Sequence, residues 1–198
     1  MKLYRILFIG LFLFGFFPAV SQAEEGGLKV SDVASFLSYA EALEPLSEEM
    51  EENNIPHFFQ VRPLDMTGKG VPSHEKAVEQ LRDEYPAYYE KTAAVIASHM
   101  HDGQHYYSNP ESWAQVADKV ILAFYTSRSD GSDQSFEAIS AKVAPLKQIA
   151  KMDPKMEEQL SGMLEMLEGF TQVSDADKQV VRQFHEQLTI HFAQYPQR

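Results

Sequence analysis

The 198-residue chain contains no cysteine. Thiol catalysis, iron–sulfur clusters and covalent attachment of c-type haem all require that residue, so these chemistries are excluded. Disulfide cross-links are excluded for the same reason. The fold must therefore be stabilised by a packed core or by a ligand.

Basic side chains are scarce as well. The chain has 17 Lys and Arg against 29 Asp and Glu, which gives a formal net charge of −12. A surface that follows nucleic-acid phosphates needs clustered Lys and Arg, so we expect no nucleic-acid partner. An anionic membrane surface is disfavoured by the same charge balance.

Long apolar runs are absent except at the N-terminus. There Lys2 and Arg5 precede ILFIGLFLFGFFPAV and the small-residue ending SQA, a pattern typical of a secretory signal peptide. The run is shorter than the roughly 20 residues needed to cross a bilayer, so we expect no stable membrane anchor. We predict a signal peptide over residues 1–23, cleavage after Ala23, and a periplasmic or secreted protein. The remaining chain then has 15 basic and 29 acidic side chains, a net charge of −14.

Beyond residue 23, apolar residues recur at helical spacing nearly everywhere. About six such stripes are visible, within residues 33–43, 85–96, 113–125, 136–146, 160–167 and 181–195. This period predicts amphipathic helices that bury one face each. We therefore expect one all-α domain over residues 24–198, built as an irregular bundle of about six helices.

The expected helix boundaries agree with these stripes. Asn109 followed by Pro110 suits a helix start, and Pro45 should end or kink its helix near the preceding residue. Four further residues stand where N-caps are expected: Ser31, Ser73, Asp133 and Ser174.

One long segment, residues 53–73, has no helical period. It carries three prolines and two glycines around the aromatic pair Phe58 and Phe59. Long loops inside compact domains are uncommon and often functional. The segment therefore has two interpretations. It is either a strap packed across the bundle or a partner-binding loop, and in the second case Phe58 and Phe59 are our candidate partner-binding residues.

Catalytic motifs begin in this sequence but are not completed. His74-Glu75 and His185-Glu186 start the zinc-hydrolase pattern, yet Val78 and Thr189 stand where the second histidine is required. No Gly-x-Ser-x-Gly element occurs either. We therefore predict no catalytic residue.

The stretch SHMHDGQHYYSNPESW, residues 98–113, holds three of the seven histidines. One interpretation is a helix end near Asp102 and Gly103, with His99 and His101 in its last turn. The other is a metal site made by His99, His101 and His105, which requires a turn at Gly103 that folds His105 back. Neutral imidazoles in such a site would suit Zn²⁺, Cu²⁺ or Ni²⁺.

Taken together, these features predict an exported, helical, non-catalytic binding or interaction protein with no cofactor. Its partner would be an unknown protein or small ligand. The first alternative is a periplasmic divalent-metal-binding protein that uses the histidine cluster. The second is a hydrolase of unknown type built on a pair such as His101 and Asp102, and no sequence motif supports this alternative.

Overall fold

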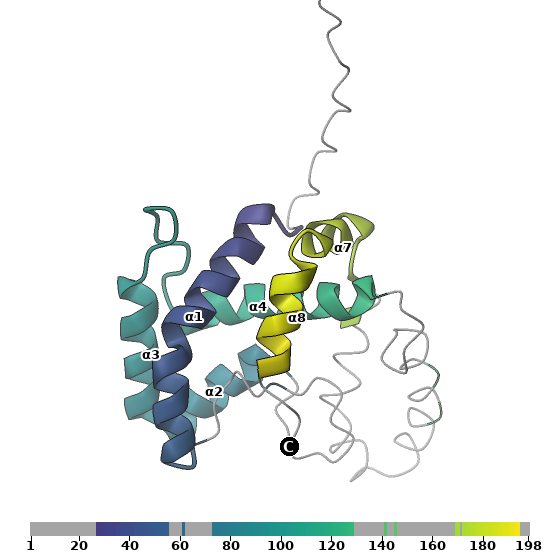
Figure 1. Cartoon of the computed structure of the whole chain (residues 1–198). Helices are drawn as coiled ribbons and strands as arrows, with labels where there is room; N and C mark the ends of the chain where they lie inside the picture. Colours follow the sequence, from purple (N-terminus) through teal and green to yellow (C-terminus); the bar gives the residue numbers. More distant parts are fainter. Residues whose placement is uncertain are drawn as a thin grey trace, which may run out of the picture.

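The computed structural model describes residues 27–55, 61, 73–128, 141, 145, 169–170 and 172–194. This part of the chain is 77% helical and contains no named strand, which confirms the predicted all-α class. Its helices are α1 (Val30–Glu52), α2 (His74–Glu84), α3 (Pro86–Ser98), α4 (Pro110–Ser127), α7 (Asp175–Arg182) and α8 (His185–Gln194) (Figure 1).

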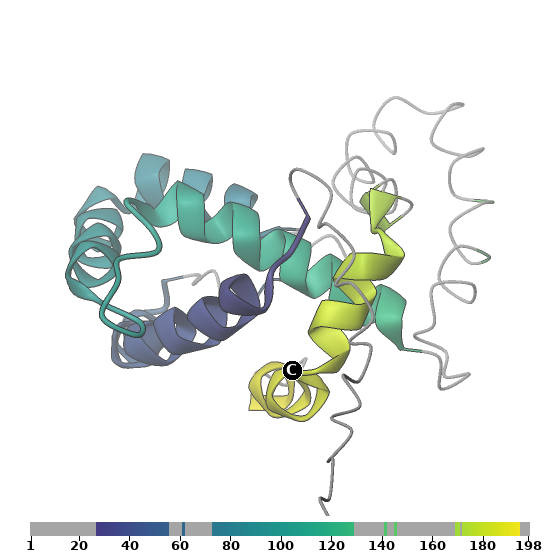
Figure 2. The same cartoon turned by 90° about the horizontal axis from the view of Figure 1, so that it is seen from above.

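Helix α4 forms the centre of the described bundle and packs against α1, α2, α3 and α7. Most of its apolar stripe is buried, with Trp113, Val120 and Phe124 all in the core. Figure 2 shows α1 and α4 running at an angle to each other, with α3 at one end and α7 at the other. The apolar stripe predicted within residues 113–125 thus belongs to the helix against which α1, α2, α3 and α7 all pack.

Helix α1 continues through Pro45 to Glu52, so the expectation that Pro45 ends its helix is wrong. An interior proline costs about 3 kcal/mol because a hydrogen bond is lost and the ring crowds the preceding turn. The two turns after Pro45 bury Leu46 and Met50 in the core. Burying two such side chains contributes about as much as the proline costs, and the helix persists.

The predicted N-caps of three helices are confirmed. Ser73 accepts a hydrogen bond from the backbone of Lys76, and Ser174 caps α7 in the same way. The Asn109 side chain accepts from the Ser112 amide at 2.8 Å, with Pro110 in the first turn of α4. Ser31 is not a cap, because α1 begins one residue earlier, at Val30, with Lys29 as its N-cap.

The N-terminus of α1 is fixed by two aspartates instead. The Lys29 amide donates to the Asp32 carboxylate at 2.8 Å, and the Leu28 amide donates to Asp177 at 2.6 Å. The second bond joins residues 149 positions apart and ties the start of α1 to α7. A local sequence pattern contains no signal for it.

Two helices differ from the predicted set. Helix α2 follows its cap Ser73 and buries Val78 and Leu81, although no stripe was assigned there. The single helix expected over 181–195 is divided into α7 and α8 at Gln183 and Phe184. Val181 and Leu188 nevertheless both reach the core, so the apolar period continues across the break.

Several predictions lie outside the described residues. These are Phe58, Phe59 and most of segment 53–73, the signal peptide, the cap at Asp133 and most of the stripes within 136–146 and 160–167. Among the helices that are described, none is long and apolar enough to cross a membrane.

Candidate functional site

The histidine-rich stretch forms a tight chain reversal between α3 and α4. Helix α3 ends at Ser98, and the backbones of His101 and Gln104 exchange two hydrogen bonds of 3.0 Å. Asp102 and Gly103 between them both have positive φ, 48° and 74°, as a two-residue type I′ turn requires. The helix end predicted near Asp102 is therefore wrong, because the Asp-Gly pair makes a hairpin turn four residues beyond the true end.

This turn is fastened to α1 through a buried tyrosine. The Tyr39 hydroxyl donates to the His99 carbonyl at 2.8 Å and accepts from the Tyr106 amide at 3.1 Å. Ser38 adds a hydrogen bond of 2.9 Å to Nε2 of His99. Both sides of the reversal are thus held at one point on α1, and the turn projects beyond the end of α3 (Figure 1).

Tyr107 extends the same attachment one residue further. Its hydroxyl lies 2.8 Å from the Ser35 hydroxyl, and its ring meets Tyr39 edge to face with centroids 4.7 Å apart. Burial raises the pKa of Tyr107 above the ordinary value, so this phenol stays neutral at any physiological pH. We call residues 99–105 the anchored turn.

The three predicted metal ligands are brought onto this one turn. Gly103 does fold His105 back, and Nδ1 of His105 donates to the His99 carbonyl at 3.0 Å. Nε2 of His99 is bonded to Ser38, while Nε2 of His101 lies 3.6 Å from the Asp102 carboxylate, too far for a hydrogen bond. Within the described residues, no three His, Cys, Asp or Glu side chains are placed to hold a metal ion.

Most side chains of the anchored turn point to solvent. Met100 has 48% of its surface exposed, and Asp102, Gln104 and His105 are exposed as well. The turn thus presents an apolar thioether, a carboxylate, an amide and an imidazole on a fixed backbone. Such a mixed surface suits recognition of a partner rather than covalent chemistry.

A second group of histidines, which the sequence did not indicate, lies in the core. His74 begins α2 and is 3% exposed, and its Nδ1 donates to the Asp118 carboxylate of α4 at 2.7 Å. The same carboxylate accepts the backbone amides of His74, at 2.7 Å, and Glu75, at 3.1 Å. Asp118 therefore satisfies the N-terminus of α2 and the imidazole together.

His191 of α8 completes this group. Its ring meets the Phe36 ring edge to face with centroids 5.3 Å apart, and His74 approaches the same ring at 6.5 Å. Burial, and then the charge of His74, lower the pKa of His191 to about 4. His191 is therefore neutral at pH 7. We call His74, Asp118 and His191 the buried histidine cluster.

No sequence signal could have revealed this cluster. His74 and Asp118 are 44 residues apart, and His191 lies more than 70 residues further on. The local pattern identified Ser73 as a helix cap, which it is, but the partner that fixes the imidazole comes from another helix. The cluster contains a histidine and a carboxylate at hydrogen-bonding distance, as an enzyme would need, yet it is enclosed and its carboxylate is occupied by the α2 backbone.

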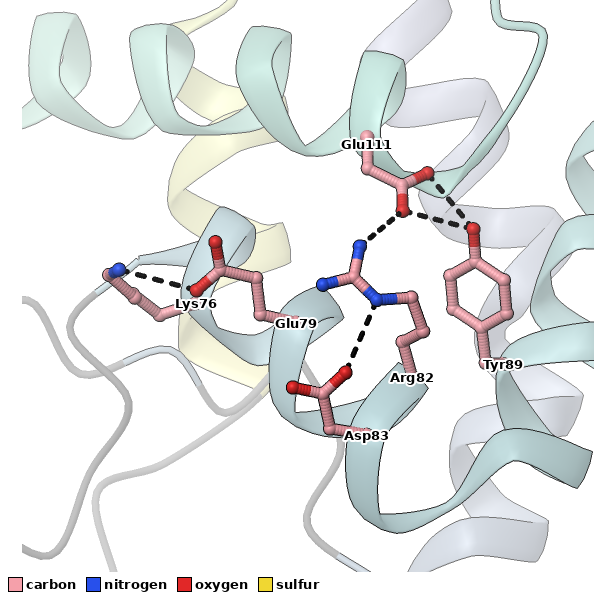
Figure 3. Close-up of polar contacts among 6 residues, drawn as sticks. All are labelled: Lys76, Glu79, Arg82, Asp83, Tyr89 and Glu111. Carbon is pink, nitrogen blue, oxygen red and sulfur yellow. Dashed lines mark hydrogen bonds and ion pairs between the residues drawn. The ribbon is translucent and has the colours of Figure 1, made fainter.

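The polar residues in Figure 3 form a third group, on the surface where α2, α3 and α4 meet. The Glu111 carboxylate accepts from the Tyr89 hydroxyl at 2.9 Å and from Arg82 at 3.4 Å, and Arg82 also contacts Asp83. Partial burial, and then the hydrogen bond to Glu111, raise the pKa of Tyr89. Exposed ion pairs of this kind add little to stability, and here they join α2, α3 and α4 at the surface.

Comparison with protein-family models, with curated proteins and with solved structures finds no match to this chain.

Proposed function

We propose that this protein is an exported, non-catalytic binding or interaction protein that uses the anchored turn as a contact surface. The observation that carries the proposal is the contrast within residues 99–105. Their backbone is fixed to α1 through Tyr39, whereas the side chains of Met100, Asp102 and His105 remain exposed.

Fixed backbone and exposed side chains together favour binding. A partner that docks on the turn does not have to order it first, so less of the contact energy is lost to conformational entropy. Binding residues are commonly carried on loops that a rigid scaffold positions, and the α1–α4 core is such a scaffold. The partner class is an unknown protein or small ligand. Phe58 and Phe59 remain predicted partner-binding residues.

Export is part of this proposal and is supported by the N-terminal sequence pattern. The charge balance disfavours a nucleic-acid partner. If the signal peptide is removed as predicted, mass spectrometry of protein recovered from the periplasm or medium will find Glu24 as the first residue. Recovery of a cytoplasmic chain that begins at Met1 would contradict the export part alone.

The contact surface is tested by photo-crosslinking. A photoreactive residue at Met100 should give one discrete product in the native host, identified by mass spectrometry. The same residue at Ile190, which is 54% exposed on α8, is the control for surface accessibility. A product from position 100 alone supports the turn as the contact surface, and equal products from both positions contradict it.

Gly103 offers a matched pair of variants for the same experiment. A Cβ at Gly103 would meet no atom within 4 Å, so the cost of a substitution comes from its φ of 74° alone. Asn tolerates this conformation and Val does not. Gly103→Asn should keep the crosslinked product and Gly103→Val should lose it, since only the second opens the turn. A product that survives in both variants would exclude the turn.

A divalent-metal function is the second candidate, favoured by one observation. The reversal at Gly103 brings His105 to His99, which a site made by His99, His101 and His105 requires. Nε2 of His99 is bonded to Ser38 and Nδ1 of His105 to the His99 carbonyl, so the other ring nitrogens, Nδ1 of His99 and Nε2 of His105, would have to bind Zn²⁺, Cu²⁺ or Ni²⁺. The metal titration described in the Discussion distinguishes this candidate from the first.

A further inference from the structure

Helix α8 docks on the bundle through an aromatic contact and one leucine. Phe192 packs against Phe124 with ring centroids 5.1 Å apart and against Phe36 and Tyr125 at 6.4 Å each. Leu188, one turn earlier, is fully buried. The helix joins α7 through only two residues, so it can move without unwinding its neighbour.

The same contact contains a titratable group. The His191 ring meets the Phe36 ring edge to face, with centroids 5.3 Å apart. The His74 ring lies 6.5 Å from the same Phe36 ring and 5.3 Å from the Trp113 ring, again between centroids. Two imidazoles thus share one phenyl ring, one carried by α8 and one by α2.

The charged and titratable groups that face this contact can be named for each described helix. From α2 it is His74, and from α4 it is Asp118, which receives two α2 amides. The end of α4 adds Tyr125, whose ring stacks on Phe192, and Arg128, which lies over the Phe124 ring at 5.8 Å. From α1 the facing group is the Phe36 ring, and α8 itself carries His185, whose ring lies 5.7 Å from that of Phe124, and the exposed Glu186. A proton on His191 would therefore be added next to His74 and an aromatic ring.

We propose that the docking of α8 is acid-sensitive: protonation of His191 releases α8 from Phe36 while α1, α2 and α4 stay folded. The device does not depend on the proposed binding function. Release uncovers the Phe36 and Phe124 rings, so the protein presents an apolar surface in acid that it conceals at neutral pH.

The direction follows from linkage. The docked helix favours neutral His191, whose pKa there is about 4, whereas a released histidine has its ordinary value of 6.5. The released form therefore binds a proton more readily, and its population rises as the pH falls from 6.5 towards 4. The docking equilibrium should weaken roughly 20-fold between pH 7 and pH 5.

Hydrogen–deuterium exchange with mass spectrometry tests this on protein expressed from the full sequence and processed by the host. After correction for the intrinsic exchange rate, peptides from α8 should lose protection between pH 7 and pH 4, while those from α1 and α4 keep theirs. Simultaneous loss of protection in all these helices would overturn the proposal, because it would mean global acid unfolding.

Variants at position 191 separate the proton from the contact. His191→Phe keeps a ring against Phe36 but cannot be protonated, so α8 should remain protected at pH 5. His191→Arg carries a permanent charge and should leave α8 unprotected at pH 7. Glu186→Gln, on an exposed position of the same helix, is the control and should behave as the wild type.

The fluorescence of Trp113 is a second measurement of α8 release that does not depend on hydrogen exchange. Trp113 is the single tryptophan of the chain, and its ring stacks on Phe36 at 5.6 Å. Its fluorescence should change with an acid midpoint that His191→Phe removes and Glu186→Gln preserves. An acid transition that is identical in wild type and His191→Phe, by either method, would overturn the proposal.

Discussion

The anchored turn and the buried histidine cluster contain the same residue type in opposite surroundings. His101 and His105 lie within seven residues of each other in the sequence and largely face solvent or the turn itself. His74 and His191 come from opposite ends of the domain and meet around one core phenylalanine. The density of histidines along the chain is therefore a poor guide to where their chemistry is altered.

The physical difference between the two regions is desolvation. The exposed side chains of the anchored turn keep their contact with water. Removing water from His191 penalises the charged form and lowers its pKa to about 4. The effects expected from the cluster are therefore on stability and pH response, and those expected from the turn are on the binding that we propose for it.

The largest effect is expected at Asp118. Asp118→Ala removes the acceptor of the His74 ring and of two backbone amides at the start of α2, and leaves all three donors in a closed space. Breaking a buried pair of this kind should lower the free energy of unfolding by about 4 kcal/mol. Urea denaturation followed by circular dichroism measures it.

Asp118→Asn is the matched control for this prediction. Its amide oxygen, placed where Oδ1 lies, can still accept both hydrogen bonds from His74 and loses only that from the Glu75 amide, so the loss should be at most about half as large. Equal and small losses, below about 1 kcal/mol for both variants, would show that the carboxylate does not hold α2.

The next effect is the pH dependence produced by His191. Because its pKa is lowered in the folded protein, the stability that it contributes is complete above pH 6.5 and is lost as the pH falls towards 4. A shift from 6.5 to about 4 corresponds to at most about 3 kcal/mol. The free energy of unfolding, measured at pH 7, 5.5 and 4.5, should fall more steeply for wild type than for His191→Phe.

The comparison of slopes is essential here, since the carboxyl groups of the chain also titrate in this range. They are common to both proteins, so the difference between the two curves isolates His191. Parallel curves would mean that the buried imidazole does not discriminate between its two protonation states. His105→Gln, in the exposed turn, should give a curve parallel to that of wild type.

A smaller effect is expected where the anchored turn meets α1. Tyr39→Phe keeps the ring in the core but removes the hydroxyl that donates to His99 and accepts from Tyr106. Two lost hydrogen bonds at a partly buried site should cost about 2 kcal/mol, whereas Ser38→Ala loses one and should cost about 1 kcal/mol.

Thermal melting measures both variants, and amide exchange at Gln104, whose NH bonds to the His101 carbonyl, reports on the turn itself. If the turn were independent of α1, protection of Gln104 would be unchanged in Tyr39→Phe.

Features of the fold that depend on neighbouring residues were predictable from the sequence. The buried stripe of α4 and the caps at Ser73, Asn109 and Ser174 are set by interactions within one or two helical turns. Pro45 shows where this reasoning fails: its local penalty was judged correctly, but the burial of Leu46 and Met50 that offsets it depends on other helices.

For the sites too, local features were predictable from the sequence and contacts between helices were not. The need for a turn at Gly103 that returns His105 followed from the spacing, and the structure contains that turn. The length of α3 was overestimated, because an Asp-Gly pair can begin a hairpin turn as well as follow a helix end. The contact of His74 with Asp118 joins two helices and had no local signal.

The smallest effect is expected from divalent metals. Within the described residues, no three His, Cys, Asp or Glu side chains are placed to hold a metal ion, so His99, His101 and His105 would have to rearrange to bind one. We therefore expect Zn²⁺, Cu²⁺ and Ni²⁺ to leave the melting temperature of chelator-treated protein unchanged, in wild type and in a triple alanine variant at His99, His101 and His105. Binding to the native state would raise the melting temperature by mass action. A rise with one metal that the triple variant abolishes would make the anchored turn a metal centre, and the binding function proposed for it would give way.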